Sequence, residues 1–191
     1  MTDRLPDGGL IRKLWPADAA AYREHLLRLD PESRRSRFGG AVSSEFIRNY
    51  AAVSRGLDSV IHGFFVGGVL RGVAELRLLG SKFTQEAEAA LSIEKPWQSH
   101  GVGLALLKRI LLSARNRRIK LLHMACLAEN KPMQRLARKF DGELSFHFGG
   151  IEAEVAAAPP TPVSLMRETF ADSLGFATAV LDVQARILKP A

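Results

Sequence analysis

The segment that most constrains this chain is Gln98-Ser99-His100-Gly101-Val102-Gly103, which joins an expected strand at residues 87–93 to an expected helix. The helix is predicted from apolar positions that fall on one face, namely Leu104, Leu107, Leu111 and Ala114. Amides in the first turn of a helix lack intrahelical acceptors, and the helix dipole adds partial positive charge beside them. Gly101 and Gly103 carry no Cβ that would hold an anion away. The segment therefore indicates a phosphate or pyrophosphate site, with an ordinary strand-to-helix turn as the alternative.

Two other phosphate-binding motifs do not fit the sequence. A dinucleotide-binding fingerprint needs glycine or alanine at position 106, where this chain has Leu106. A Walker loop needs GxxxxGK followed by serine or threonine, a pattern that the sequence does not contain. Both of these nucleotide-binding classes are therefore disfavoured.

The strands that precede the glycine segment are expected to form an antiparallel meander. Two strand-like runs, residues 60–66 and 69–78, are separated by Gly67-Gly68. That dipeptide permits the positive φ angles of a tight hairpin turn. Residues 87–93 supply the third strand of the meander.

A buried strand, a helix and two further strands are expected after the first helix. Residues 119–127 are apolar except at two positions, one of them His123, a pattern typical of a strand covered on both faces. His123 is interpreted as a structural histidine and Cys126 as a buried core thiol. Strand, helix and strand then make a right-handed βαβ unit with parallel strands. Asn130 can cap the next helix, and strands are expected at 143–148 and 151–155, the latter continuing the edge.

The remaining segments are predicted from the positions of proline and glycine and from the spacing of apolar residues. Helices are expected at 17–29 and 44–53, separated by a charged, glycine-terminated segment at 30–40 that is expected to be a loop, with a loop containing a helical turn as the alternative. Three prolines mark 156–163 as a linker, and 164–191 is expected to be a C-terminal amphipathic helix with Gly175 as its weak point. Its apolar stripe is expected to pack on the domain or across a dimer, and comprises Met166, Phe170, Leu174, Ala177, Leu181 and Leu188.

Composition bounds the functional classes. With 191 residues, 47% of them apolar, the chain can bury a full core as one domain. One cysteine makes no internal disulfide and no Cys or His group has zinc-site spacing, so no metal is expected. No stretch reaches the roughly 18 apolar residues of a membrane helix and no secretory signal is evident, so a cytoplasmic protein without membrane partners is expected. The net charge of +7 favours anionic partners, but nucleic acid is disfavoured because the charge forms no dense basic arm.

The segment Gln98–Gly103 matches the signature Q/R-x-x-G-x-G/A, and the chain thereby resembles the GNAT superfamily of acyl-CoA-dependent N-acetyltransferases. The order of elements agrees over residues 10–150, about three quarters of the chain. The resemblance implies an α/β (α+β) fold in which a mixed sheet of about six or seven strands is flanked by helices, with residues 1–155 as the acetyltransferase domain. Several pieces are similar in particular to the GNAT domain of bacterial protein-lysine acetyltransferases: Leu29–Phe38, Ala87-Glu88, Trp97-Gln98, Glu129–Met133 and Leu136–Phe140.

The resemblance also implies acetyl-CoA as the acyl donor. Backbone groups of Leu91 and Ile93 would pair with the pantetheine arm as a strand pairs with an added edge. The pyrophosphate would be held by backbone amides of Gln98, Ser99, His100, Gly101, Val102, Gly103 and Leu104. Asn130 matches the position whose side chain contacts the cofactor in the family, with helix capping as the alternative. His100 departs from the family, many members of which carry arginine or lysine there.

Glu88 matches the strand glutamate that serves as general base in the resembling lysine acetyltransferases. A primary amine is therefore expected to attack the thioester directly, with Glu88 taking its proton. A glutamate that merely faces water is the alternative, and Glu75 and Glu94 are weaker candidates for the base. Many family members have a tyrosine that protonates the departing thiolate, where this chain has Ala137. The acid is then water, unnecessary or absent.

Three functions are weighed on these grounds. The leading one is an N-acetyltransferase that acts on a protein lysine or a small-molecule amine, with a homodimer left open. The first alternative is a non-catalytic acyl-CoA-binding or regulatory module, favoured by Ala137. The second is a nucleic-acid or protein-interaction domain that uses the positive charge and the C-terminal helix.

Overall fold

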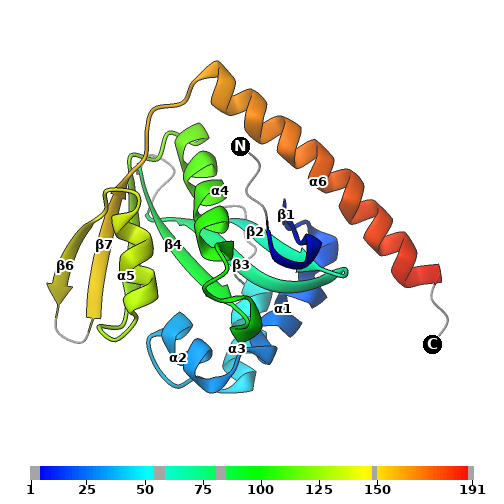
Figure 1. Cartoon of the computed structure of the whole chain (residues 1–191), viewed down its shortest axis with the longest axis horizontal. Helices are drawn as coiled ribbons and strands as arrows, with labels where there is room; N and C mark the ends of the chain where they lie inside the picture. Colours follow the sequence, from blue (N-terminus) through cyan, green and yellow to red (C-terminus); the bar gives the residue numbers. More distant parts are fainter. Residues whose placement is uncertain (1–4, 54–58, 81–84, 148–149, 189–191) are drawn as a thin grey trace.

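The computed structural model describes residues 5–53, 59–80, 85–147 and 150–188, and a seven-stranded sheet forms the centre of this described part (Figure 1). The strand order is β1-β2-β3-β4-β5-β7-β6. Only β4 and β5 run parallel, and the other neighbouring pairs are antiparallel. The strands are β1 (Leu10–Lys13), β2 (Ser59–Val66), β3 (Val69–Leu78), β4 (Glu86–Ile93), β5 (Leu121–Cys126), β6 (Glu143–His147) and β7 (Gly150–Ala156).

Helices flank this sheet, which confirms the expected mixed α/β fold with a C-terminal helix. They are α1 (Ala19–Arg28), α2 (Pro31–Phe38), α3 (Ser44–Val53), α4 (Val102–Asn116), α5 (Lys131–Arg138) and α6 (Pro162–Leu188). Three short 3-10 turns accompany them: η1 (Pro6–Gly8), η2 (Pro16–Asp18) and η3 (Lys95–Trp97).

The β2–β3 hairpin starts the meander as the sequence predicts. Gly67 and Gly68 have φ angles of 56° and 75°, which side chains with a Cβ rarely adopt. Positive φ at both central residues gives a turn whose twist matches that of the two strands. Val66 therefore pairs directly with Val69, and β3 pairs in turn with β4.

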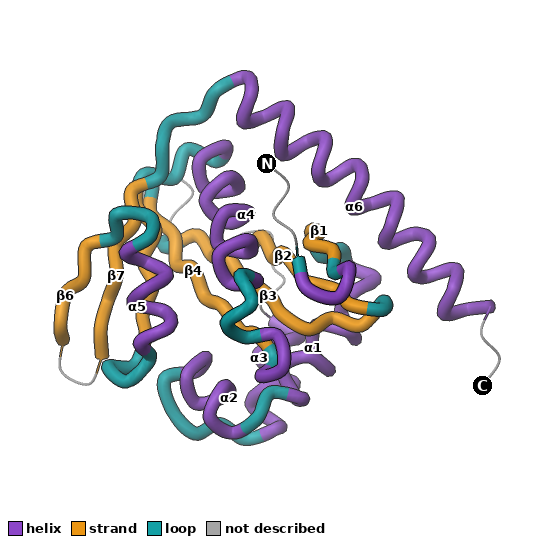
Figure 2. Tube along the Cα trace, in the orientation of Figure 1, coloured by secondary structure: helices purple, strands orange, loops and turns teal. Residues whose placement is uncertain are grey.

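Two apolar cores lie on opposite faces of the sheet. On one face, α4 packs on β2, β3 and β4, while α5 packs on β5, β6 and β7. On the other face, α1 packs on β3 and on α3 (Figure 2). Alternation along β3 supplies both cores, since Ala74 and Leu76 point toward α4 whereas Val73 joins the cluster of α1 and α3. The second core does not extend over β5 and β7, so this half of the sheet face stays open.

Residues 31–38 form helix α2, which corrects the expectation of a loop. The carboxylate of Asp30 accepts hydrogen bonds from the amides of Glu32 and Ser33, and Pro31 suits the first turn. Gly39, with φ of 72°, ends the helix in the left-handed conformation. The capping residues therefore outweigh the poor apolar periodicity of this charged segment.

Two expectations for the second half of the sheet are also wrong. β5 is covered on one face only, because Leu122 and Met124 are buried while Ala125 is exposed and His123 is partly exposed. β7 does not lie at the edge, since it inserts between β5 and β6. An antiparallel hairpin added beside β5 explains both results, because it extends the sheet without adding a covering layer on the open face.

Helix α6 runs along β1 and α4 (Figure 1). It docks mainly through polar and small side chains, and the ring of Phe176 packs edge-to-face against Trp15. Glu168 binds Asn116 and Arg117 of α4, and Ser164 is buried. Gly175 is a close contact rather than a weak point, because a Cβ there would lie 3.0 Å from the Cβ of Arg12. None of the helices in the described residues is long and apolar enough to cross a membrane.

The predicted apolar stripe of α6 faces away from the rest of the described chain. The exposed fractions are 72% for Met166, 68% for Phe170, 56% for Leu174 and 62% for Leu181. Packing of these side chains on their own domain, one of the two expected outcomes, is therefore wrong. The side chain of Leu188 lies outside the described residues.

A buried polar chain ties β2, α4 and α6 together. The Nε2 atom of His62 lies 2.9 Å from Ser113 Oγ, and this hydroxyl donates to Glu168 Oε1 at 2.7 Å. The hydroxyl hydrogen is used toward Glu168, so His62 donates its Nε2–H to Ser113 and is neutral. Burial, with Arg109 adding to the effect, lowers the pKa of His62 to about 3. His25, also fully buried, has its pKa lowered by burial as well.

We predict that stability falls between pH 6.5 and 5. In this range the unfolded chain protonates His62 whereas the folded chain does not, and the lowered pKa of His25 acts in the same direction, so acid favours unfolding. For His62 alone the free energy of unfolding should decrease by about 1.4 kcal/mol per pH unit below roughly 6.5. Urea unfolding of wild type, His62→Gln and the exposed control His100→Gln measures this slope. A His62→Gln slope equal to that of the wild type would contradict the prediction.

Candidate active site

The parallel strands β4 and β5 separate after a short paired stretch. Pairing covers only Glu86–Glu88 with Leu121–His123, although β4 continues to Ile93 and β5 to Cys126. Beyond Glu88, β4 stays paired with β3 on its other side. The backbone of β4 from residue 89 therefore faces an opening in the sheet instead of a neighbouring strand.

A cavity of about 520 Å³, here called the splay cavity, occupies this opening. Side chains from both separated strands and from α2 form its walls. Glu88 and Leu91 contribute from β4, Cys126 from β5, and Asn130 from the start of α5. The other lining residues are Ser36, Arg37, Phe38, Gly39, Ala90, Ala125, Leu127, Met133, His147, Gly150, Ile151 and Glu152.

The glycine segment follows β4 and leads into α4, as the sequence predicts. Ser99 and Gly101 have positive φ angles of 62° and 82°, and they turn the chain from η3 into the helix. No side chain caps the amides of the first turn of α4, and a Cβ on Gly101 would meet nothing within 4 Å. Open space beside uncapped amides is what an anion requires. Gly103 instead packs near Ile93 and Leu136.

Three other predicted cofactor residues have contacts within the chain. The side-chain amide of Gln98 donates to Ser33 Oγ and to the carbonyl of Ile93, at 2.9 Å and 2.8 Å, and so ties α2 to the end of β4. His100 Nδ1 lies 2.6 Å from the carbonyl oxygen of Gln98. Asn130 Oδ1 accepts from the amide of Met133, so Asn130 caps α5 and also lines the splay cavity.

Glu88, the predicted base, lies at the last position of β4 that pairs with β5. It lines both the splay cavity and a smaller cavity of about 100 Å³ beside it. Within the described residues its carboxylate makes no hydrogen bond or ion pair, although Arg77 is its cross-strand neighbour. This carboxylate is accessible from the cavity and is not neutralised by an arginine.

The smaller cavity holds a group that sequence reasoning did not identify. Arg37 of α2 contacts Glu75 Oε1 and the hydroxyl of Tyr50, each at 2.6 Å, and that hydroxyl donates to Glu75 Oε2 at 2.8 Å. Both partners of the Arg37–Glu75 ion pair are buried. Burial and the charge of Glu75 raise the pKa of Tyr50, which keeps its hydroxyl protonated. No local signal marks this group, because its members come from three separate elements.

Glu94, the other alternative base, is held by three partners. Arg28 Nε lies 3.0 Å from Oε1 and Arg71 Nη1 lies 2.9 Å from Oε2, while His25 Nδ1 lies 3.2 Å from Oε1. Burial raises the pKa of Glu94, but the hydrogen bonds from His25 and Arg71 and the nearby positive charges together outweigh burial. The net shift of the pKa is therefore downward. Neutral His25 donates to Glu94 and accepts from Ser92. This network fixes α1 to the end of β4.

We predict that Glu94→Gln lowers the free energy of unfolding by about 2–4 kcal/mol, because losing one partner of a buried ion pair leaves the other charges uncompensated. The effect should not reach the upper end of the usual range, since Arg28 and Arg71 are partly exposed. Urea unfolding measures it, with the exposed Glu24→Gln as control. A loss no larger than that of the control would show that Glu94 does not fix α1.

The structure also shows the surroundings of Cys126 and Ala137, two residues considered in the sequence analysis. Cys126 is half-buried and lines the splay cavity, so it is not a core thiol. Burial raises the pKa of its thiol, which stays protonated. Ala137 is fully buried in the apolar core, and no hydroxyl replaces the family tyrosine at that position.

A sequence model of the acetyltransferase (GNAT) family matches residues 23–142. This range contains the separated strands, the glycine segment and Glu88. The chain belongs to the acetyltransferase (GNAT) family and is an acyltransferase. No curated protein sequence matches it.

Solved structures share the fold. The GNAT domain of PAT from S. lividans has a TM-score of 0.65 at 23% identity, with 76% of this chain and 89% of that chain covered. Spermidine N-acetyltransferase from Vibrio cholerae, in complex with CoA and spermine, has a TM-score of 0.62 at 13% identity, covering 78% and 95%. PaiA N-acetyltransferase from Thermoplasma acidophilum, in complex with coenzyme A, has a TM-score of 0.59 at 18% identity, covering 78% and 98%.

Proposed function

We propose that this protein is an acetyl-CoA-dependent N-acetyltransferase that acts on a primary amine, with Glu88 as general base. The observation that carries the proposal is a difference in ion pairing among three carboxylates near the splay cavity. Glu75 is occupied by Arg37 and Tyr50, and Glu94 by His25 and two arginines. Glu88 alone of the three lines the splay cavity without an ion pair among the described residues. An unpaired carboxylate can accept a proton more readily than one held by arginine.

The residues around the splay fit an acyl-CoA. The unpaired edge of β4 offers backbone groups of Leu91 and Ile93 to the pantetheine arm, as an edge strand offers them to an added strand. Uncapped amides from Val102 onward suit the pyrophosphate, and Asn130 lines the same opening. Acetyl-CoA supplies an acetyl thioester when bound. The neighbours from Thermoplasma acidophilum and Vibrio cholerae, both complexes with CoA, support this donor.

The side chains in the cavity support direct transfer to the amine. An amine nucleophile must be neutral, so Glu88 accepts the proton that the nitrogen loses as the new bond to carbon forms. A covalent route through Cys126 is disfavoured, because burial keeps that thiol protonated. With Ala137 buried in place of a tyrosine, the leaving sulfur departs as thiolate or takes its proton from water.

The acceptor is proposed to be a protein lysine or a small-molecule amine. The spermidine N-acetyltransferase among the neighbours supports the amine class, and the PAT domain has the highest identity of the three structures compared. α2 contributes to the wall of the splay cavity. Its position fits a role in contacting the acceptor.

We predict that Glu88→Gln reduces kcat by about 100-fold or more, the usual contribution of a general base. Its affinity for acetyl-CoA should stay at the wild-type value, since the proposed cofactor contacts are elsewhere. Steady-state assays with a panel of amines and lysine peptides measure turnover. Thermal unfolding with acetyl-CoA, CoA, NAD and ATP measures binding, and stabilisation is expected only with the two CoA compounds.

The control for this experiment is Glu24→Gln, an exposed change on α1. Equal turnover of Glu88→Gln and the control would reject Glu88 as base. CoA-specific stabilisation without turnover for any acceptor would favour a non-catalytic acyl-CoA-binding module. Steeply salt-dependent binding to DNA, with no stabilisation by CoA, would favour a nucleic-acid-binding domain.

We also propose that the exposed stripe of α6 joins two copies of the chain. Five large apolar side chains on the stripe face are exposed among the described residues of this helix, at fractions of 56% to 72%: Val163, Met166, Phe170, Leu174 and Leu181. Together they present on the order of 600 Å², at the upper end for the largest patch of a typical monomer and somewhat below one partner's share of a standard interface. A second copy can cover such a face with the identical stripe, packed around a two-fold axis.

If the stripe forms the dimer interface, mutation of the stripe should change the molecular mass of the protein in solution. Phe170→Glu combined with Leu174→Glu should shift the protein from dimer to monomer, because it buries two charges at the interface. Sedimentation equilibrium over a range of concentrations measures the mass. The exposed control Ser173→Glu on the same helix should behave as the wild type. A monomeric wild type at every concentration would overturn the proposal.

A further inference from the structure

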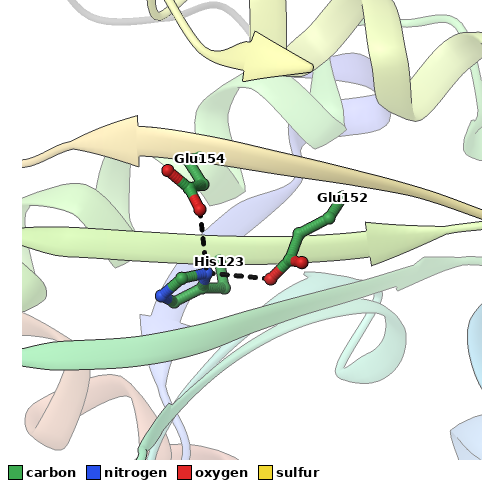
Figure 3. Close-up of side chains that lie close together, drawn as sticks. All are labelled: His123, Glu152 and Glu154. Atoms are coloured by element: carbon green, nitrogen blue, oxygen red, sulfur yellow. Dashed lines mark hydrogen bonds and ion pairs between the residues drawn. The ribbon is translucent and has the colours of Figure 1, made fainter. Parts of the chain in front are cut away.

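A histidine on the open face of the sheet is surrounded by carboxylates. His123 of β5 lies directly across from Glu154 of β7 in the register, and Glu152 is two residues further along the same strand face (Figure 3). Glu86 lies on the other side, on β4. Because β5 lacks a covering layer here, all four side chains are at least partly exposed to solvent.

The distances within this group, here called the His123 cluster, suit a shared ion. His123 Nδ1 lies 2.9 Å from Glu152 Oε1 and 3.9 Å from Glu154 Oε1. One ligand atom from each of the three residues can be chosen so that all lie within 4.8 Å of one another. Ligand atoms at 2.0–2.2 Å from a tetrahedral zinc ion are about 3.3–3.5 Å apart. The observed separations bracket that value, so small side-chain movements suffice.

Glu86 prepares the histidine for this role. Its Oε2 lies 3.2 Å from His123 Nε2, on the opposite side of the ring from Glu152 and Glu154. A carboxylate that accepts the Nε2–H keeps the proton on Nε2 when a metal ion binds, and so leaves Nδ1 as the metal-binding nitrogen. In the absence of an ion, Nδ1 donates to Glu152 Oε1, and a bound cation would take the place of that proton. Metal-bound histidines commonly have this arrangement, with a carboxylate orienting the ring from behind.

The charges of the cluster are unbalanced without a cation. Three carboxylates surround one imidazole, and in the described residues no lysine or arginine forms an ion pair with Glu86, Glu152 or Glu154. A second imidazole, that of His147, lies nearby, with its Nε2 3.7 Å from Glu152 Oε2. Elsewhere in the chain, buried carboxylates such as Glu75 and Glu94 are neutralised by arginines. The cluster thus lacks the arginine partners that neutralise the buried Glu75 and Glu94.

We propose that His123, Glu152 and Glu154 bind a divalent transition-metal ion of the zinc type, with His147 or water as a further ligand. A donor set of imidazole and carboxylate favours Zn²⁺ over Mg²⁺ and Ca²⁺, which prefer oxygen ligands alone. The site joins β5 to β7, and Glu152 and His147 also line the splay cavity. The metal site goes beyond the proposed acetyl transfer and does not depend on it.

The test uses the full chain without a histidine tag, after treatment with a chelator. Calorimetric titration with Zn²⁺ alone should give one ion per chain, and Mg²⁺ or Ca²⁺ should give no binding in the same range. Co²⁺ should give the visible absorption of a four-coordinate site. His123→Gln and Glu154→Gln should each weaken Zn²⁺ binding by more than tenfold, and Glu86→Gln by about 10-fold to 100-fold, the usual effect of removing an orienting partner.

Two comparisons keep the result decisive. Glu45→Gln, an exposed change on α3, should bind Zn²⁺ as the wild type does. Glu154 is partly exposed, so Glu154→Gln is expected to fold normally, and its circular dichroism checks this. Absence of one-to-one binding, or wild-type affinity in both His123→Gln and Glu154→Gln, would overturn the proposal. These measurements do not involve acetyl-CoA, so their failure is distinguishable from a failure of the proposed acetyltransferase function.

Discussion

The rest of the structure depends on the limited pairing of β4 with β5. Backbone groups of a strand must be paired or solvated, and beyond Glu88 β4 pairs with β3 alone, so the backbone groups on its other edge have no strand partner. The edge that remains is available to a ligand. The same separation creates the splay cavity and leaves Glu88 at its boundary. One change in strand pairing thus supplies both the free strand edge and the carboxylate on which the proposed function rests.

Ion pairs hold the elements around this opening in place. Glu94 gathers partners from α1 and β3, and the Arg37–Glu75 pair fixes α2 against β3. Gln98 adds a neutral link between α2 and the end of β4. Glu88 differs from Glu75 and Glu94, because the fold holds those two carboxylates in ion pairs and leaves Glu88 without one among the described residues.

Sequence reasoning predicted the elements whose signals are local. Gly67-Gly68 defined the hairpin, and Asn130 the start of α5, because turn and capping residues act over a few positions. It failed for α2, where the caps outweighed an unfavourable pattern, and for the cover of β5, which depends on where β7 inserts. The group formed by Arg37, Tyr50 and Glu75 could not be predicted, since its members are distant in sequence.

The sequence by itself determined the phosphate-type turn, the order of the elements and the resemblance to the GNAT superfamily, since each rests on residues close together in the chain. Only the tertiary structure decided which glutamates are neutralised, because an ion pair needs partners from separate elements. It also decided that α6 docks through its polar face and exposes its apolar stripe. Periodicity identifies an apolar face, but the partners available on the folded surface decide which face of the helix is buried.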